Sequence, residues 1–182
     1  SAETIDRPNL SYDIRNQTES SLREWVIRRR QEPGIIFCRS TKLCEHLAHK
    51  YGGLFYHGKM PAAGRIESQL AFMEGRGNPM FATNAFGMGI NKSNIRWIVH
   101  YDIPISLDEY VQETGRAGRD GLDSECVVMT PSSFRLQEFF IECQNPSFEL
   151  LKAVYDSLFD RGADQQWRMP AVKGHPHEVI GG

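Results

Sequence analysis

Residues 33–53, PGIIFCRSTKLCEHLAHKYGG, contain the pattern on which the fold assignment rests. The continuous apolar run over 35–38 is typical of a short strand buried on both faces. Ser40 fits the N-cap of a helix over 41–51, and the two glycines that follow end that helix. A buried strand followed directly by a helix is the repeating unit of a parallel sheet covered by helices.

The same alternation of apolar runs and helical patterns continues along the rest of the chain. Further strands are predicted at 10–15, 54–56, 80–82, 95–101 and 125–129. Further helices are predicted at 20–30, from Pro61 to about residue 74, after the capping box of Ser106 and Glu109, from 131 and at 147–159. We therefore expect an α/β domain over 1–132, a helical extension over 133–162, and a linker or the start of another domain over 163–182.

The composition is typical of a soluble globular protein, with 40% hydrophobic and 24% charged residues. The net charge of −2 does not mark the whole chain as a nucleic-acid binder, although a local basic groove is compatible with that sum. No apolar run approaches the length of a membrane span, and no secretory segment is evident, so no membrane partner is expected. Cys38, Cys44, Cys126 and Cys143 show no C-x-x-C spacing, which favours buried reduced thiols of a cytosolic protein over a zinc site.

The segment YVQETGRAGRDG at 110–121 is the strongest candidate for chemistry. Arg116 and Arg119 are three residues apart near a helix end, so both guanidinium groups can point the same way. Their planar, permanently charged heads suit a phosphate, and the glycines between them allow a close turn. The alternative is an ordinary helix end in which the arginines pair with Asp120 or Glu113.

Two other segments resemble known sites only superficially. Residues 53–60 nearly match a phosphate-binding P-loop, but Met60 stands where a hydroxyl should reach magnesium. The residues between the glycines are also bulky and strand-like, whereas a phosphate cradle needs bare backbone amides. Asp108 and Glu109 form an acidic pair, which the capping box explains better than a metal site does.

Five segments in a fixed order together resemble the second motor domain of superfamily-two helicases. They are GIIFCRS at 34–40, YHG at 56–58, FATNAFGMGINK at 81–92, HYDIP at 100–104 and QETGRAGRDG at 112–121. The combination of AFGMGIN at 85–91 with GRAGRDG at 115–121 resembles the RecQ family of DNA helicases in particular, and DRPN at 6–9 resembles the entry to that family's second domain. The similarity extends over about residues 6–132.

This resemblance implies a RecA-like lobe, the C-terminal motor domain, that packs against a first RecA-like lobe of the same protein. ATP with Mg²⁺ binds between the lobes, and the first lobe supplies the P-loop lysine and the acidic magnesium-binding pair. The resemblance makes Arg119 the arginine finger. The resemblance also implies that Arg116 lies beside the finger and contacts either the phosphates or carboxylates of the first lobe. Gln112 is implied to couple the finger to that lobe.

The resemblance also implies nucleotide contacts from Gly89 and Asn91. Asn91 stands where many relatives have an aspartate near the ribose, which makes a ribose contact here less certain. The Gly87-Met-Gly89 stretch after Phe86 is expected to change shape when ATP closes the cleft. The alternative is a hydrophobic plug flanked by hinges.

Polar residues that follow the predicted strands are expected to contact single-stranded DNA through its backbone. These residues are Arg39, Ser40, His57, Lys59, Thr83 and Asn84, and the resemblance supports them as a track for single-stranded DNA. Lys92 is a further candidate for a contact to DNA or to the other lobe. The backbone amides of the first helical turn after Ser40 have no partners within the helix, and they offer partial positive charge to a phosphate. Simpler roles remain open: Ser40 as an N-cap alone, His57 as a structural histidine and Lys92 in solvent.

The C-terminal part departs from the best-known RecQ pattern, in which a zinc-binding cysteine cluster often follows. Only Cys143 lies beyond Cys126, and His175 and His177 form a weak candidate at most. We assign no metal site to this chain.

The sequence thus indicates the second motor lobe of an ATP-dependent DNA helicase, with 3′-to-5′ movement implied by the resemblance. Without a P-loop the isolated chain is expected to be inactive. The bacterial cytoplasm is the expected location, or the nucleus of a eukaryote. A superfamily-two RNA helicase is a second hypothesis, which Gln112 disfavours because RNA-helicase relatives commonly have histidine there. A non-catalytic scaffold is a third, which ATPase activity of the full-length protein would exclude.

Overall fold

A computed structural model describes residues 7–87 and 90–131 of the 182-residue chain. The strands are β1 (Leu10–Asn16), β2 (Gly34–Phe37), β3 (Leu54–Tyr56), β4 (Met80–Ala82), β5 (Trp97–His100) and β6 (Ser124–Thr130). The helices are α1 (Glu19–Arg28), α2 (Thr41–Tyr51), α3 (Ala62–Met73), the 3₁₀ helix η1 (Asn84–Gly87) and α4 (Leu107–Thr114). The predicted helical extension and the segment after it lie outside the described residues, as do Met88 and Gly89.

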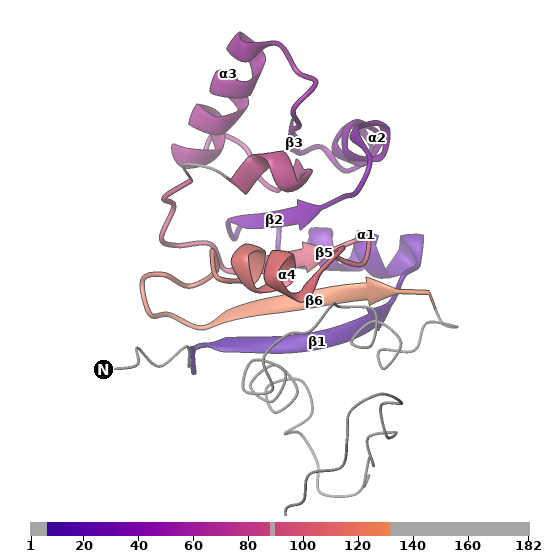
Figure 1. The fold of residues 1–182 in the computed structure, drawn as a ribbon, viewed down its shortest axis with the longest axis vertical. Helices are drawn as coiled ribbons and strands as arrows, with labels where there is room; N and C mark the ends of the chain where they lie inside the picture. Colours follow the sequence, from indigo (N-terminus) through magenta and orange to yellow (C-terminus); the bar gives the residue numbers. More distant parts are fainter. Residues whose placement is uncertain (1–6, 88–89, 132–182) are drawn as a thin grey trace, which may run out of the picture.

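The six strands form one parallel sheet in the order β1-β6-β5-β2-β4-β3, with helices on both faces (Figure 1). Successive residues of a strand point to opposite faces. In β2, Ile36 therefore packs with α1 and α2, while Ile35 and Phe37 pack with α3 and η1. The predicted α/β class and the parallel sheet covered by helices are confirmed.

Helix boundaries follow the capping residues. The side chain of Ser40 accepts a hydrogen bond from the amide of Leu43 (3.1 Å), as predicted. Ser106 does the same for the amide of Glu109 (3.1 Å), and the Glu109 carboxylate accepts from the amide of Ile105 (2.8 Å). Helix α1 begins one residue before the predicted start because Thr18, rather than a later residue, is its cap.

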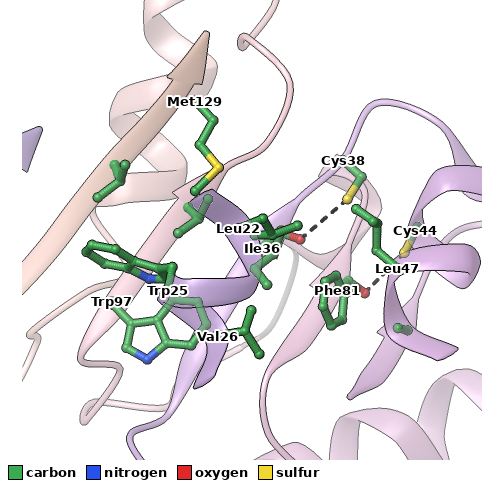
Figure 2. Packing of buried hydrophobic residues seen from close by; sticks show 13 residues of the cluster. Leu22, Trp25, Val26, Ile36, Cys38, Cys44, Leu47, Phe81, Trp97 and Met129 are labelled. Atoms are coloured by element: carbon green, nitrogen blue, oxygen red, sulfur yellow. Dashed lines mark hydrogen bonds between the residues drawn. The ribbon is translucent and has the colours of Figure 1, made fainter. Parts of the chain in front are cut away.

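The central seam of the sheet, between β2 and β5, depends on a glycine. Gly34 pairs with Trp97, whose indole lies so close to the glycine that a β-carbon there would overlap the ring. Trp97 is fully buried, its Nε1 donates to the carbonyl of Glu32 (3.1 Å), and Trp25 meets it edge-on at 6.4 Å between ring centroids (Figure 2). The indole takes the space that any other side chain at position 34 would need.

The three cysteines in the described part of the chain are buried and free, as predicted for Cys38, Cys44 and Cys126. Figure 2 shows the thiol of Cys38 directed to the carbonyl of Ile36, and that of Cys44 to the carbonyl of Phe81. Burial raises the pKa of the Cys44 thiol to about 11 and that of Cys126 to about 12, and it raises the pKa of Cys38 further. These groups are therefore structural and poorly nucleophilic at neutral pH.

Gly34→Ala is expected to destabilise the domain by about 3 kcal/mol, because the added methyl group overlaps the Trp97 indole at the sheet's central seam. The free energy of unfolding in urea measures the loss. Gly58→Ala is the matched control: its β-carbon would approach only Ala85, at 3.8 Å, and the expected change is under about 0.5 kcal/mol. Equal losses for the two variants would show that the Gly34 contact does not limit packing.

Candidate functional site

The arginine segment forms a tight loop, residues 115–121, directly after α4. Gly118 and Gly121 have φ values of 54° and 82°, in the left-handed region that glycine adopts without strain. The amide of Gly118 donates to the carbonyl of Ile95 (2.9 Å), and the amide of Asp120 donates to that of Ser93 (3.2 Å). Both acceptors precede β5, so the loop lies at the amino ends of β5 and β6.

The two arginines differ in exposure. Arg119 is exposed; its Nε donates to the carbonyl of Gly115 (3.2 Å) and its Nη1 to that of Ile90 (3.3 Å). Arg116 is half-buried, and its Nε has no hydrogen-bond partner within the described residues. Burial lowers the pKa of Arg116, and the neighbouring charge of Arg119 lowers it further.

The carboxylates that could have neutralised these arginines are bound elsewhere. Asp120 makes a two-pronged ion pair with Nη2 of Arg96 (2.5 and 2.6 Å), and this hydrogen bond lowers the pKa of the Asp120 carboxyl group. Glu113 is buried and bonds Nε2 of His100 (2.8 Å). Within residues 7–87 and 90–131, neither Arg116 nor Arg119 forms an ion pair. The ion pair with Asp120 or Glu113 that the alternative predicted is not formed by either arginine, although the lowering of the Arg116 pKa by burial and by Arg119 is partly offset by the nearby charge of Glu113.

Two residues that the sequence analysis did not consider as site residues also bind this loop. The guanidinium of Arg7 and the amide of Asn9 donate hydrogen bonds to loop carbonyls more than a hundred positions away. The resemblance of segment 6–9 to a domain entry was the only sequence signal for them, and that signal specified no partner.

The remaining residues assigned to the nucleotide lie near the loop in sequence or in space. Gln112 is exposed on α4, and Asn91 is exposed one residue after Ile90, whose carbonyl binds Arg119. Gly89 lies outside the described residues. The structure thus brings Asn91 and both arginines to one end of the sheet, the amino end of β5.

The residues assigned to DNA, with the exception of Lys92, lie at the opposite, carboxyl ends of the strands. Arg39 and Ser40 follow β2, Thr83 and Asn84 follow β4, and all but the buried Thr83 are exposed. The amide of Arg39 donates to the Asp102 carboxylate after β5 (2.8 Å), which leaves the guanidinium at the surface. Lys59 is exposed in the loop after β3.

Two of the predicted DNA contacts have side chains that are engaged inside the domain. The imidazole of His57 is buried, and its Nε2 bonds the Glu45 carboxylate at 2.7 Å. The ammonium of Lys92 donates to the carbonyl of Met73 at the end of α3 (3.1 Å) and lies 5.6 Å from the centre of the Phe72 ring. Burial lowers the pKa of Lys92. A cation at a helix C-terminus is favoured by the helix dipole, which gives Lys92 a structural role without DNA.

The segment between β4 and β5 joins the two ends of the sheet. Phe86 is buried against Tyr56 (4.8 Å between ring centroids) and Phe72 (5.8 Å). Ile90 enters the same cluster and gives its carbonyl to Arg119. The chain therefore passes from the end with the candidate DNA contacts to the end with the arginines within residues 83–95.

Two further features of the described residues bear on the choice of site. Within 7–87 and 90–131, no three His, Cys, Asp or Glu side chains gather closely enough to hold a metal ion. None of the described helices, α1 to α4, combines the length and hydropathy that a membrane crossing needs.

Comparison with known proteins identifies relatives that match most of this chain. The family profile of the helicase conserved C-terminal domain matches residues 17–121. The chain is 37% identical over 148 residues to the ATP-dependent DNA helicase RecQ of Haemophilus influenzae, covering 76% of this chain and 24% of that protein. It is 38% identical over 146 residues to RecQ of Bacillus subtilis, covering 76% and 25%. The chain thus spans about a quarter of the length of these curated relatives.

Solved structures share the fold at lower sequence identity. The yeast DEAD-box splicing factor Prp28 superposes with a TM-score of 0.67 and 18% identity, over 91% of this chain and 40% of that one. At this identity the likeness establishes the architecture of the domain.

The buried pair of His100 and Glu113 is expected to stabilise the site's scaffold. Glu113→Ala leaves the imidazole without its carboxylate partner and should lower the free energy of unfolding by about 3 kcal/mol. Glu113→Gln keeps an amide acceptor for the ring and should lower it by about 1 kcal/mol. Urea unfolding of both variants, and of His100→Leu, Glu113→Leu and their double variant, provides the test. Additive losses in the double variant would contradict a direct interaction between the two side chains.

Proposed function

Since the chain belongs to the family of helicase conserved C-terminal domains, we propose that it is the second motor lobe of a RecQ-type DNA helicase driven by ATP. The observation that supports this most directly is the pair Arg116 and Arg119. They are three residues apart on a glycine loop held by hydrogen bonds, and neither forms an ion pair with a carboxylate among the described residues. Beyond the effect of burial, the charge of Arg119 lowers the pKa of Arg116 more than the nearby charge of Glu113 raises it, so the two cations repel each other, and an anion bound between them relieves that repulsion.

The polyphosphate of ATP is the anion that fits the family. Arg119 is exposed and bonds two backbone carbonyls, so its remaining N–H groups are free to reach a phosphate oxygen. As the arginine finger it stabilises the charge that develops on the transferred phosphoryl group. Arg116, half-buried beside it, contributes a second positive charge to the same anion.

The rest of the nucleotide site is proposed to come from both lobes. Exposed Gln112 faces the first lobe and couples it to the finger, while Asn91 and Gly89 contact the nucleotide on this lobe. ATP with Mg²⁺ is held jointly, with the P-loop and the magnesium-binding carboxylates on the first lobe. This chain alone is therefore inactive as an ATPase.

The DNA track is proposed to run along the carboxyl ends of β2, β3 and β4. Exposed Arg39, Ser40, Lys59 and Asn84 contact backbone phosphates, with Thr83 below them. His57 belongs to the same end, and its bond to Glu45 supports a role in shaping it. Lys92, the last of the predicted set, bonds Met73 at the end of α3 beside Asn91 and supports the structure away from this track. Movement from 3′ to 5′ is part of the proposal and follows from the family resemblance.

Arg119→Ala in the full-length protein is expected to lower kcat for DNA-stimulated ATP hydrolysis by about 10³–10⁵-fold, because the developing phosphoryl charge loses its finger. Steady-state phosphate release measures it. Arg76→Ala, at an exposed arginine paired with Glu74, is the control and should leave kcat unchanged. The 182-residue chain by itself should show no turnover. Turnover by the isolated chain that Arg119→Ala abolishes would contradict a finger that acts across two lobes.

Replacing Arg39 or Lys59 by alanine in the full-length protein is expected to weaken single-stranded DNA binding and to reduce the slope of log K against log salt by about 0.7 for each lost phosphate contact. Fluorescence anisotropy across a salt series provides the measurement. Lys50→Ala, at the far end of α2 and paired with Glu19, is the control and should leave the slope unchanged. Stronger stimulation of the ATPase by single-stranded RNA than by DNA would favour the RNA-helicase alternative.

A further inference from the structure

We propose that Arg7 and Asn9 are positioning residues that set the direction of the two catalytic arginines. This inference rests on the proposed function of Arg116 and Arg119. Arg7 and Asn9 precede β1, and the loop that they bind lies between α4 and β6, more than a hundred residues later.

Arg7 binds the loop only through main-chain carbonyl groups. Its Nη2 donates to the carbonyls of Ala117 (2.7 Å) and Gly118 (3.0 Å), and its Nη1 donates to that of Gly115 (3.5 Å). The last carbonyls of a helix lack partners within the helix, and a cation there is favoured by the helix dipole. A planar guanidinium with several fixed donors can serve three such acceptors at once, whereas a lysine ammonium cannot match that geometry.

The bound carbonyls are the ones that control the arginines. The Gly115 carbonyl belongs to the peptide group that precedes Arg116, and the Gly118 carbonyl belongs to the one that precedes Arg119. Holding these two peptide planes fixes the backbone from which each side chain departs. Arg7 therefore sets the starting direction of both guanidinium groups without touching either of them.

Asn9 completes the hold on Gly118. Its side-chain amide donates to the carbonyls of Gly118 (2.9 Å) and Leu122 (2.9 Å). A β-carbon at position 118 would overlap this amide and would lie 2.7 Å from the Leu122 carbonyl oxygen. The glycine is thus needed for the close approach of Asn9 as well as for its positive φ.

The opposite side of the loop is held by Arg96. This residue pairs with Asp120 and donates to the carbonyl of Asp123 (3.2 Å). Its contacts with the loop lie after Arg119, whereas Arg7 binds the carbonyl of Gly115, just before Arg116, and that of Gly118, just before Arg119. The hydrogen bonds from Arg7 and Asn9 are accordingly the ones that fix the backbone next to both arginines.

Arg7→Ala in the full-length protein is expected to lower kcat for DNA-stimulated ATP hydrolysis by about 10- to 100-fold, as expected for a small misplacement of a catalytic group. Arg7→Lys retains the positive charge but loses the planar guanidinium group with its several fixed donors, and it should lower kcat by at least about 5-fold. The dissociation constant for single-stranded DNA should change by less than about 2-fold in both. Arg15→Ala is the matched control in β1, where Arg15 pairs with Asp13, and should leave kcat unchanged.

The deciding measurement is kcat of the double variant Arg7→Ala, Arg119→Ala. If Arg7 acts through Arg119, Arg7→Ala should lower kcat by less than about 2-fold once Arg119 is absent. An equal loss in both backgrounds, or parallel losses of DNA binding and kcat, would overturn the positioning role. Thermal unfolding of every variant identifies loss of folding, and where Arg7→Ala does not fold, Arg7→Lys and Asn9→Ala serve in the same cycle. If Arg119→Ala alone leaves kcat intact, the proposed finger fails, and the inference about Arg7 fails with it.

Discussion

The contact between the Trp97 indole and the backbone of Gly34 is the constraint on which the rest of the domain depends. It lies at the pairing of β2 with β5, the one seam between the β2-β4-β3 half of the sheet and the β5-β6-β1 half. The candidate DNA residues follow the strands of the first half. The arginine loop and its partners Arg7, Asn9 and Arg96 belong to the second. Register at this single seam therefore sets where the two candidate sites lie relative to each other.

The two sites also lie at opposite ends of the strands. The polar residues after β2, β3 and β4 are at the carboxyl ends, whereas loop 115–121 bonds the residues before β5. Segment 83–95 connects the two ends, with Phe86 and Ile90 buried in one cluster and the Ile90 carbonyl bound to Arg119. A conformational change at one end of the sheet can thus reach the other end along this short segment of chain, as well as through the rigid sheet.

Local sequence patterns predicted the strands and α-helices of the described residues, though not the 3₁₀ helix at Asn84–Gly87. Helix 41–51 has the predicted bounds because Ser40 and the glycines after Tyr51 act over one helical turn. The predicted strand over 95–101 begins later, at Trp97, because the carbonyl of Ile95 is taken by Gly118 and Ser124. The partners of site residues were not predictable in this way. Arg96 with Asp120, His57 with Glu45 and Lys92 with Met73 meet only after the chain folds, since 12 to 24 residues separate the members of each pair.

Arg7 and Asn9 recognise the arginine loop through carbonyl groups, which every amino acid possesses. Their hold is consequently indifferent to the identity of most side chains in the loop, and it is strict only at Gly118, where the amide of Asn9 leaves no room for a β-carbon. These hydrogen bonds therefore do not depend on the side chain at position 116. The residues that fix the backbone conformation of the loop are thus different from the residues whose side chains give the loop its chemistry.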